Sequence, residues 1–272
     1  MRWISPAGIV IIMFALLAGC QRTAMMPGAV PAPLQQAEKH LRNGDIAAAR
    51  QAADSYLQQS PTFQSYLQVL ALWSSNEQYE LSAEYAERAL KDTRLRLNSL
   101  EEAQLWQIRA DSLGYLKRYE EAIPCYEEVL KRTPSNPVTL NNYAYLLAEA
   151  NTRLDEAEAM ANRALAAEPN NPVYLDTLGW IYYRQGRYQQ AVQLLEQAVQ
   201  DAPQEPELRY HLGMAYWRRG RLPEARVELR KAANLWRIQK GKPYEDALKA
   251  LEQVEKGIRA NPPEERRERI EL

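Results

Sequence analysis

Few residues of this chain have the types and spacing that catalysis or metal binding requires. The 272 residues include two histidines, His40 and His211, and two cysteines, Cys20 and Cys125, and the members of each pair lie far apart in the sequence. Metal sites and hydrolytic triads need ligands or nucleophiles in defined groups, and no motif for a metal, a phosphate loop or a nucleophilic serine occurs. We therefore expect a protein that is not an enzyme, with no catalytic residue, no metal, no cofactor and no small-molecule substrate. His211 is expected to be a packed helix residue.

The residue with the clearest chemical role is Cys20. A basic residue near the start is followed by an apolar run over 9–18, which is typical of a secretory signal and about half as long as a membrane-spanning helix. The run ends in Leu17-Ala18-Gly19-Cys20, which resembles the lipobox of bacterial lipoproteins. That resemblance implies a signal peptide over 1–19, cleaved before Cys20, whose thiol then carries lipid such as palmitate. An ordinary signal peptide and a cysteine-containing membrane anchor are the alternatives.

The residues after Cys20 bear on localisation and on the remaining thiol. By resemblance to lipoproteins, Gln21 implies the outer membrane rather than the inner membrane. Residues 20–33 contain three prolines and few charges, so we expect a lipidated cysteine followed by a flexible, extended tether. Cys125 is then the only free thiol, and we expect it to be buried on a helix. An intermolecular disulfide is the alternative.

The composition excludes some classes of protein. With 46% hydrophobic and 25% charged residues the chain has the composition of a folded protein, and its length suggests about two domains. The net charge of −1 gives no electrostatic reason to expect a nucleic-acid partner. Only 11 glycines are present, which disfavours glycine-rich phosphate loops and turn-dense β folds.

A repeat with a period near 34 residues organises the chain after the tether. Small side chains recur at spacings of 33, 40, 35, 34 and 34 residues, at Ala49, Ser82, Ala122, Ala157, Ala191 and Ala225. An upstream column runs in parallel through Ala37, Leu70, Ala110, Ala144, Gly179 and Gly213. Small residues at matching positions allow two helices to pack closely, so each period predicts a helix hairpin (helix A, then helix B). Prolines then end the second helix of four units, at Pro61, Pro134, Pro169 and Pro203.

These residues resemble the tetratricopeptide repeat. The clearest unit, 172–205, has Leu178-Gly179, Tyr182, Gly186, Tyr188, Ala191, Leu195, Ala198 and Pro203 at the positions typical of the family. The resemblance implies an all-α fold over 34–258, a right-handed α-solenoid of about six such hairpins plus a C-terminal capping helix. The units 30–62 and 63–96 match least well, in their first helices.

Two features mark where helices begin and end. Ser99 with Glu102 predicts a capping box after a short break in the solenoid at 97–102. Beyond Gly241 and Pro243, an apolar stripe predicts the capping helix, at Tyr244, Ala247, Leu248, Leu251, Val254 and Ile258. The charged segment 259–272 is predicted to be disordered.

The family resemblance also implies which residues face the concave groove. At its groove positions this chain has Tyr145, Asp176, Trp180, Tyr183, Tyr210, Met214 and Trp217. Exposed aromatic side chains are typical anchors for a bound peptide, and packing between neighbouring first helices is the alternative. Basic clusters at 184–187 and 218–221 are either solvated turns or an edge for an acidic partner or anionic lipid.

The prediction for function combines the anchor and the groove. We expect a lipid-anchored periplasmic scaffold or adaptor that binds a peptide or helix of a protein partner, in envelope assembly, pilus biogenesis or delivery to a protease. A permanent structural subunit of an envelope or secretion complex is the alternative.

Overall fold

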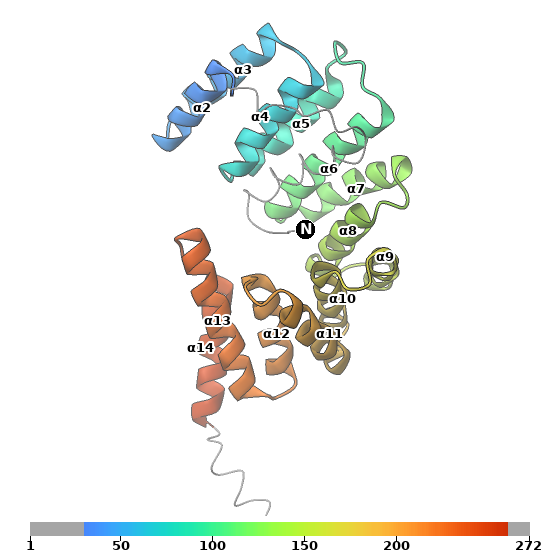
Figure 1. Ribbon diagram of the computed structural model, residues 1–272, viewed down its shortest axis with the longest axis vertical. Coiled ribbons are helices and arrows are strands. Elements are labelled where there is room, and N and C mark those ends of the chain that lie inside the picture. Colours follow the sequence, from blue (N-terminus) through green and yellow to red (C-terminus); the bar gives the residue numbers. More distant parts are fainter. Residues whose placement is uncertain (1–29, 261–272) are drawn as a thin grey trace, which may run out of the picture. The chain divides into compact units, whose positions relative to one another are not determined.

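The computed structural model describes residues 30–260, which form thirteen helices and no strand (Figure 1). Six consecutive helix pairs are followed by a single last helix. In chain order the helices are α2 (Ala32–Arg42), α3 (Ile46–Gln59), α4 (Phe63–Ser75), α5 (Tyr79–Lys91), α6 (Ser99–Tyr115), α7 (Tyr119–Arg132), α8 (Pro137–Glu149), α9 (Leu154–Ala167), α10 (Pro172–Arg184), α11 (Tyr188–Asp201), α12 (Pro206–Arg218), α13 (Leu222–Lys240) and α14 (Glu245–Ala260). The expected all-α architecture of hairpins with a terminal helix is confirmed.

The signal peptide, Cys20 and most of the expected tether and tail lie outside the described residues, so these stay predictions. Within 30–260, no helix combines the length and the apolar character needed to cross a membrane.

The chain divides into two compact units, one ending at Thr139 and one beginning at Leu140, inside α8. In the first unit each helix from α2 to α6 packs against the next helix along the chain, up to α7. Its core is centred on large side chains that include Trp73, Tyr85 and Leu105. In the second unit the helices from α9 to α14 pack in the same sequential way, around a core that includes Leu195, Leu212 and Leu229.

The two columns of mostly small residues are buried, as the period predicted. All six residues of the downstream column, among them Ala49 and Ala225, have an exposed fraction of 0%. Ser82 holds this place in the second hairpin, where its hydroxyl is 3.0 Å from that of Ser74 and accepts from Ser112 at 2.8 Å. A hydroxyl is therefore tolerated in the column because buried neighbours satisfy it.

Local sequence signals set the helix boundaries. The side chains of Asp45 and Thr62 accept hydrogen bonds from amides in the first turns of α3 and α4, and Pro172 and Pro206 begin α10 and α12. The capping box of α6 is formed by Asn98 and Glu101, one residue before the expected pair. The prediction of Ser99 as the cap was wrong because Asn98 is equally suited to this role and directly precedes the first helical residue.

Two expectations at the ends need correction. The tether was expected to extend to residue 33, but α2 begins at Ala32, since a proline in the first turn of a helix loses no required amide hydrogen bond. In α14 the buried residues are Ala247, Ala250 and Val254, whereas Leu248 is 41% exposed. The buried stripe is thus rotated from Leu248 toward Ala250, where the small side chain allows α14 to approach its neighbours.

Candidate functional site

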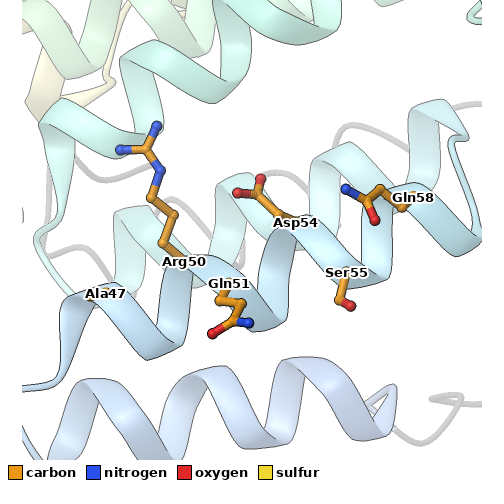
Figure 2. Close-up of a pocket in the computed structure, with 6 residues that line it drawn as sticks. All are labelled: Ala47, Arg50, Gln51, Asp54, Ser55 and Gln58. Carbon is orange, nitrogen blue, oxygen red and sulfur yellow. The ribbon is translucent and has the colours of Figure 1, made fainter.

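A hollow of about 460 Å³ on α3 is lined by Ala47, Arg50, Gln51, Asp54, Ser55 and Gln58 (Figure 2). Its charged groups already have partners. Arg50 pairs with Glu84, while Asp54 accepts hydrogen bonds from the Tyr85 hydroxyl and from Arg88 Nη1, both at 2.7 Å. These side chains join α3 to α5, so we assign no ligand site there. Across residues 30–260, no three His, Cys, Asp or Glu side chains are grouped so that they could hold a metal ion.

The second unit contains a cluster of aromatic rings from α8, α10 and α12, each of which is the first helix of its hairpin. Trp180 of α10 lies between two neighbours. Its ring is 4.2 Å from that of His211 of α12, with an interplanar angle of 20°, and 4.5 Å from that of Tyr183, with an angle of 4°. Tyr210 approaches the same ring from α12 at 6.4 Å, and the ring of Tyr145 of α8 is 6.1 Å from that of His211. Aromatic stacking of this kind stabilises the packing of α8, α10 and α12.

One ring of the cluster, that of His211, also belongs to a buried pair with Asp176. His211 Nδ1 is 2.9 Å from both carboxylate oxygens of Asp176, and both side chains are almost fully buried. Burial lowers the pKa of His211, but the carboxylate of Asp176, together with those of Glu149 and Glu207, outweighs this effect, so the pKa is raised above its ordinary value. The pair links α10 to α12.

The second polar contact of the cluster connects α10 to α8. Trp180 Nε1 donates to Glu149 Oε1 at 2.7 Å, and Arg184 Nη2 donates to the main-chain carbonyl of Glu149 at 3.2 Å. These contacts satisfy the indole N–H that burial would otherwise leave without an acceptor.

The expected groove residues thus fall into two groups. Asp176 and Trp180 are 5% and 4% exposed, so the expectation that they are open to a partner was wrong. They pack between neighbouring first helices, because the stack and the ion pair fill the space between α10 and α12. Half-buried side chains make up the other group, which consists of Tyr145, Tyr183, Tyr210, Met214 and Trp217.

One face of α12 carries three large apolar side chains that are partly accessible. Tyr210, Met214 and Trp217 are spaced four and three residues apart and are all half-buried. All three pack with one side against the core that α11, α12, α13 and α14 share. We call these three residues the α12 face.

Tyr244 and Trp236 belong to the same cluster and were not among the expected site residues. The ring of Tyr244 is 4.4 Å from that of Trp236 and 5.3 Å from that of Tyr210. Tyr244 directly precedes α14, so the start of the last helix covers one end of the α12 face. Its place after Pro243, in the apolar stripe, indicated packing but not this contact.

A carboxyl group near the cluster has an altered protonation. Burial raises the pKa of Glu207, in the first turn of α12, to about 7. A hydrogen bond from its own backbone and the charges of His211 and Lys240 lower this pKa, but by less than burial raises it. Glu207 therefore titrates near neutral pH.

His211, Glu149 and Glu207 also went unrecognised as a group. The relevant signal is the register between units: Asp176 and His211 are separated by 35 residues, one period plus one, and Glu149 and Arg184 by 35 as well. Residues separated by one period plus one can therefore meet across neighbouring first helices.

Comparisons with known proteins agree with this architecture. Residues 116–181 and 177–243 each match a family model described as tetratricopeptide repeat. A TPR repeat-containing protein of Pseudomonas aeruginosa is 31% identical over 170 residues, which are 62% of this chain and 28% of the relative. The chain therefore aligns with little more than a quarter of the length of that protein.

The solved structures that are similar in fold include the following two. A tetratricopeptide repeat protein from Parabacteroides merdae has a TM-score of 0.58 at 14% identity, covering 82% of this chain and 91% of the other. PilW, described as a widely conserved type IV pilus biogenesis factor, has a TM-score of 0.56 at 22% identity, with coverages of 74% and 94%.

Proposed function

The chain is a tetratricopeptide repeat protein, and on that premise we propose that it acts as a lipid-anchored scaffold or adaptor for another protein of the bacterial envelope. The fold supports a role in protein–protein interaction. The observation that carries the proposal is the α12 face, where Tyr210, Met214 and Trp217 present half-buried apolar area on one helix. Large rigid side chains of this kind anchor a peptide or helix at small entropic cost. The proposed role involves no catalysis.

The membrane attachment rests on Cys20. Leu17-Ala18-Gly19-Cys20 at the end of an apolar run supports cleavage before the cysteine and acylation of its thiol. Several acyl chains on one residue hold a protein stably on a bilayer, and Gln21 supports the outer membrane, with the repeats facing the periplasm. Anchoring raises the local concentration of any partner that the repeats bind.

Three roles fit such an adaptor: pilus biogenesis, outer-membrane assembly and delivery of substrates to a periplasmic protease. The likeness to PilW supports the first only at the level of the fold, since the identity is 22%. A permanent structural subunit of an envelope complex is the second candidate function. An adaptor is released on dilution, whereas a subunit co-purifies in fixed stoichiometry.

The anchor is tested by metabolic labelling. Radiolabelled palmitate should enter the wild-type chain and not Cys20→Ser, and the wild type should fractionate with the outer membrane. Equal labelling of both chains would refute acylation at Cys20.

The binding surface is tested by crosslinking in intact cells with a C-terminal tag. Trp180→Ala is unsuitable because Trp180 is buried. Met214→Ala with Trp217→Ala removes half-buried side chains, and we expect loss of the crosslinked partner. The matched control is Val227→Ala with Ile238→Ala, which removes exposed apolar side chains of α13. A partner retained by Met214→Ala/Trp217→Ala would place the contact elsewhere and favour the fixed subunit.

A further inference from the structure

Two arginines occupy equivalent places in neighbouring hairpins of the second unit. Arg184 ends α10 and Arg218 ends α12, and they are 34 residues apart. Each is therefore the last residue of the first helix of its hairpin, beside the aromatic cluster.

Both guanidinium groups lie over rings. Arg218 is 4.6 Å from the centroid of the Tyr188 ring and also lies against the Tyr183 hydroxyl. Arg184 is 6.0 Å from the ring centroid of Trp180. Tyr183 stacks on Trp180, and its ring centroid is 5.6 Å from that of Tyr188. These three rings are therefore in contact in series between the guanidinium groups of Arg184 and Arg218.

Neither arginine has a carboxylate partner within residues 30–260. Arg184 donates to a main-chain carbonyl, that of Glu149, and its buried Nε–H has no acceptor. The carboxylate of Glu149 instead accepts from Trp180 Nε1 at 2.7 Å. Arg218 is exposed.

The neighbouring turns provide an internal comparison. Arg187 and Arg221 are also 34 residues apart, and each lies over a tyrosine ring, at 3.9 and 4.3 Å. However, Arg187 Nη1 is 2.8 Å from Glu158 Oε2, and Arg221 Nε is 2.9 Å from Glu224 Oε1. A spacing of one repeat and a guanidinium over an aromatic ring are thus common to both pairs, while an ion pair with a carboxylate is found for Arg187 and Arg221 alone among these four arginines.

The helix ends compensate only part of the remaining charge. A helix C-terminus carries about half of an elementary negative charge, which is less than the full charge of the arginine beside it. The edge N–H groups of a guanidinium form a fork that matches a carboxylate, and the side chain of Arg218 is exposed while that of Arg184 is half-buried.

We propose that Arg184 and Arg218 bind carboxylate side chains of an acidic segment in the protein partner, while apolar side chains of that segment contact the α12 face. The inference rests on the proposed function, since it names the chemistry of the partner. Charge complementarity selects this occupant, because the site has two arginines without a carboxylate partner among residues 30–260 and a set of aromatic rings between them. A lipid headgroup would need no apolar face of one helix beside it.

The test is selection of peptides from a random 12-residue display library on the full-length detergent-purified chain. We expect the selected peptides to be enriched in Asp and Glu next to apolar residues. Binding of a selected peptide should weaken by roughly tenfold or more for Arg184→Gln/Arg218→Gln, the size expected when a charge-assisted hydrogen bond is lost. Arg187→Gln/Arg221→Gln removes the same charge and should bind within about twofold of wild type. Because Arg184 is half-buried, the exposed Arg218→Gln is measured alone as well, and thermal melting of each variant confirms folding.

The outcomes separate the two proposals. Selected peptides without acidic enrichment, or equal weakening by both double variants, would overturn the arginine site and leave a peptide-binding scaffold intact. Selection of no peptide at all, together with an unchanged crosslinked partner in Met214→Ala/Trp217→Ala, would overturn both. Binding of phosphatidylglycerol vesicles that depends on Arg184 and Arg218, without binding of acidic peptides, would reassign the site to lipid.

Discussion

A Cβ atom on Gly179 of α10 would lie 2.8 Å from the Leu195 Cγ atom of α11. The glycine is therefore required by the leucine that faces it. The next hairpin repeats the relationship, with 2.7 Å between a Cβ on Gly213 and Leu229 Cγ. In the hairpin of α8 and α9, the positions equivalent to Gly179 and Leu195 hold Ala144 and Ala161. In these three hairpins a glycine is thus matched with a leucine, and an alanine with an alanine.

This complementarity predicts a coupling between Gly179 and Leu195. Gly179→Ala forces the leucine to shift and should lower the free energy of unfolding by about 1–3 kcal/mol, as overpacking does. Leu195→Ala leaves a cavity and should lower it by about 2–5 kcal/mol. The double variant recreates the pair of alanines and should be more stable than the sum of the two losses predicts, by at least about 1 kcal/mol.

Urea denaturation of the wild type, the two single variants and the double variant measures this double-mutant cycle. Losses that simply add would show that the leucine relaxes away from the new methyl group.

The turns within the hairpins provide a second prediction. Lys117 is the middle residue of the turn between α6 and α7 and has a φ of 58°, whereas Gly186 has a φ of 78° at the same place after α10. A left-handed conformation costs a residue with a side chain roughly 1–2 kcal/mol. A glycine avoids this cost, but the gain in stability is smaller because glycine loses more chain entropy on folding. Lys117→Gly should therefore stabilise the chain by about 0.5–1 kcal/mol.

The reciprocal change is the control for that turn. Gly186→Ala introduces a methyl group that meets no atom within 4 Å, so any loss of stability comes from the backbone alone. It should destabilise by about 1 kcal/mol in thermal or urea denaturation. If both changes destabilise, Lys117 must be held by contacts of its side chain rather than tolerated by the turn.

The sequence predicted the hairpins well because their determinants are local. The buried columns, such as the one through Ala191 and Ala225, follow from helical spacing and from a period that any neighbour must match. Proline and capping residues then limited the helix ends to within a residue or two, as the shift of the capping box from Ser99 to Asn98 shows.

The candidate site was less predictable because it depends on contacts between hairpins. Periodicity places Asp176, Trp180 and His211 toward the same side of neighbouring helices. It does not show that Asp176 and His211 pair at 2.9 Å, nor that Trp180 stacks between two rings and is buried. The contact of Tyr244 with Tyr210 depends on the direction in which the chain leaves α13, which the repeat pattern does not specify.

The charged groups around His211 predict a decrease in stability with increasing pH. Glu207 has its pKa raised from 4.5 to about 7, so the folded state holds a proton that the unfolded state has released, and stability falls as pH rises from about 4.5 to 7. The pKa of His211 is raised above 6.5, so the stabilisation from its pair with Asp176 is complete below pH 6.5 and is lost as pH rises through the folded pKa. Both effects have the same sign.

Urea denaturation between about pH 5 and 8 tests this, with tryptophan fluorescence as the signal because Trp180 stacks on His211. Glu207→Gln should reduce the slope between about pH 5 and 7 and leave the decrease at higher pH, which belongs to His211. The other groups that face His211 are Asp176 and Glu149. An unchanged slope in Glu207→Gln would show that Glu207 ionises as an ordinary exposed carboxyl group.

The last prediction concerns Cys125, for which an intermolecular disulfide was the alternative. The side chain is 3% exposed, and its Sγ–H donates to the main-chain carbonyl of Glu121 at 3.3 Å. Burial is the main cause that raises the pKa of this thiol, so little reactive thiolate forms at neutral pH. In Cys20→Ser, where Cys125 is the only thiol, iodoacetamide should modify the native chain far more slowly than the chain unfolded in urea. The same protein should run as a monomer on a non-reducing gel after oxidation by air. A disulfide-linked dimer formed without denaturant would mean that α7 opens readily enough to expose Cys125, and that this thiol is available to a partner.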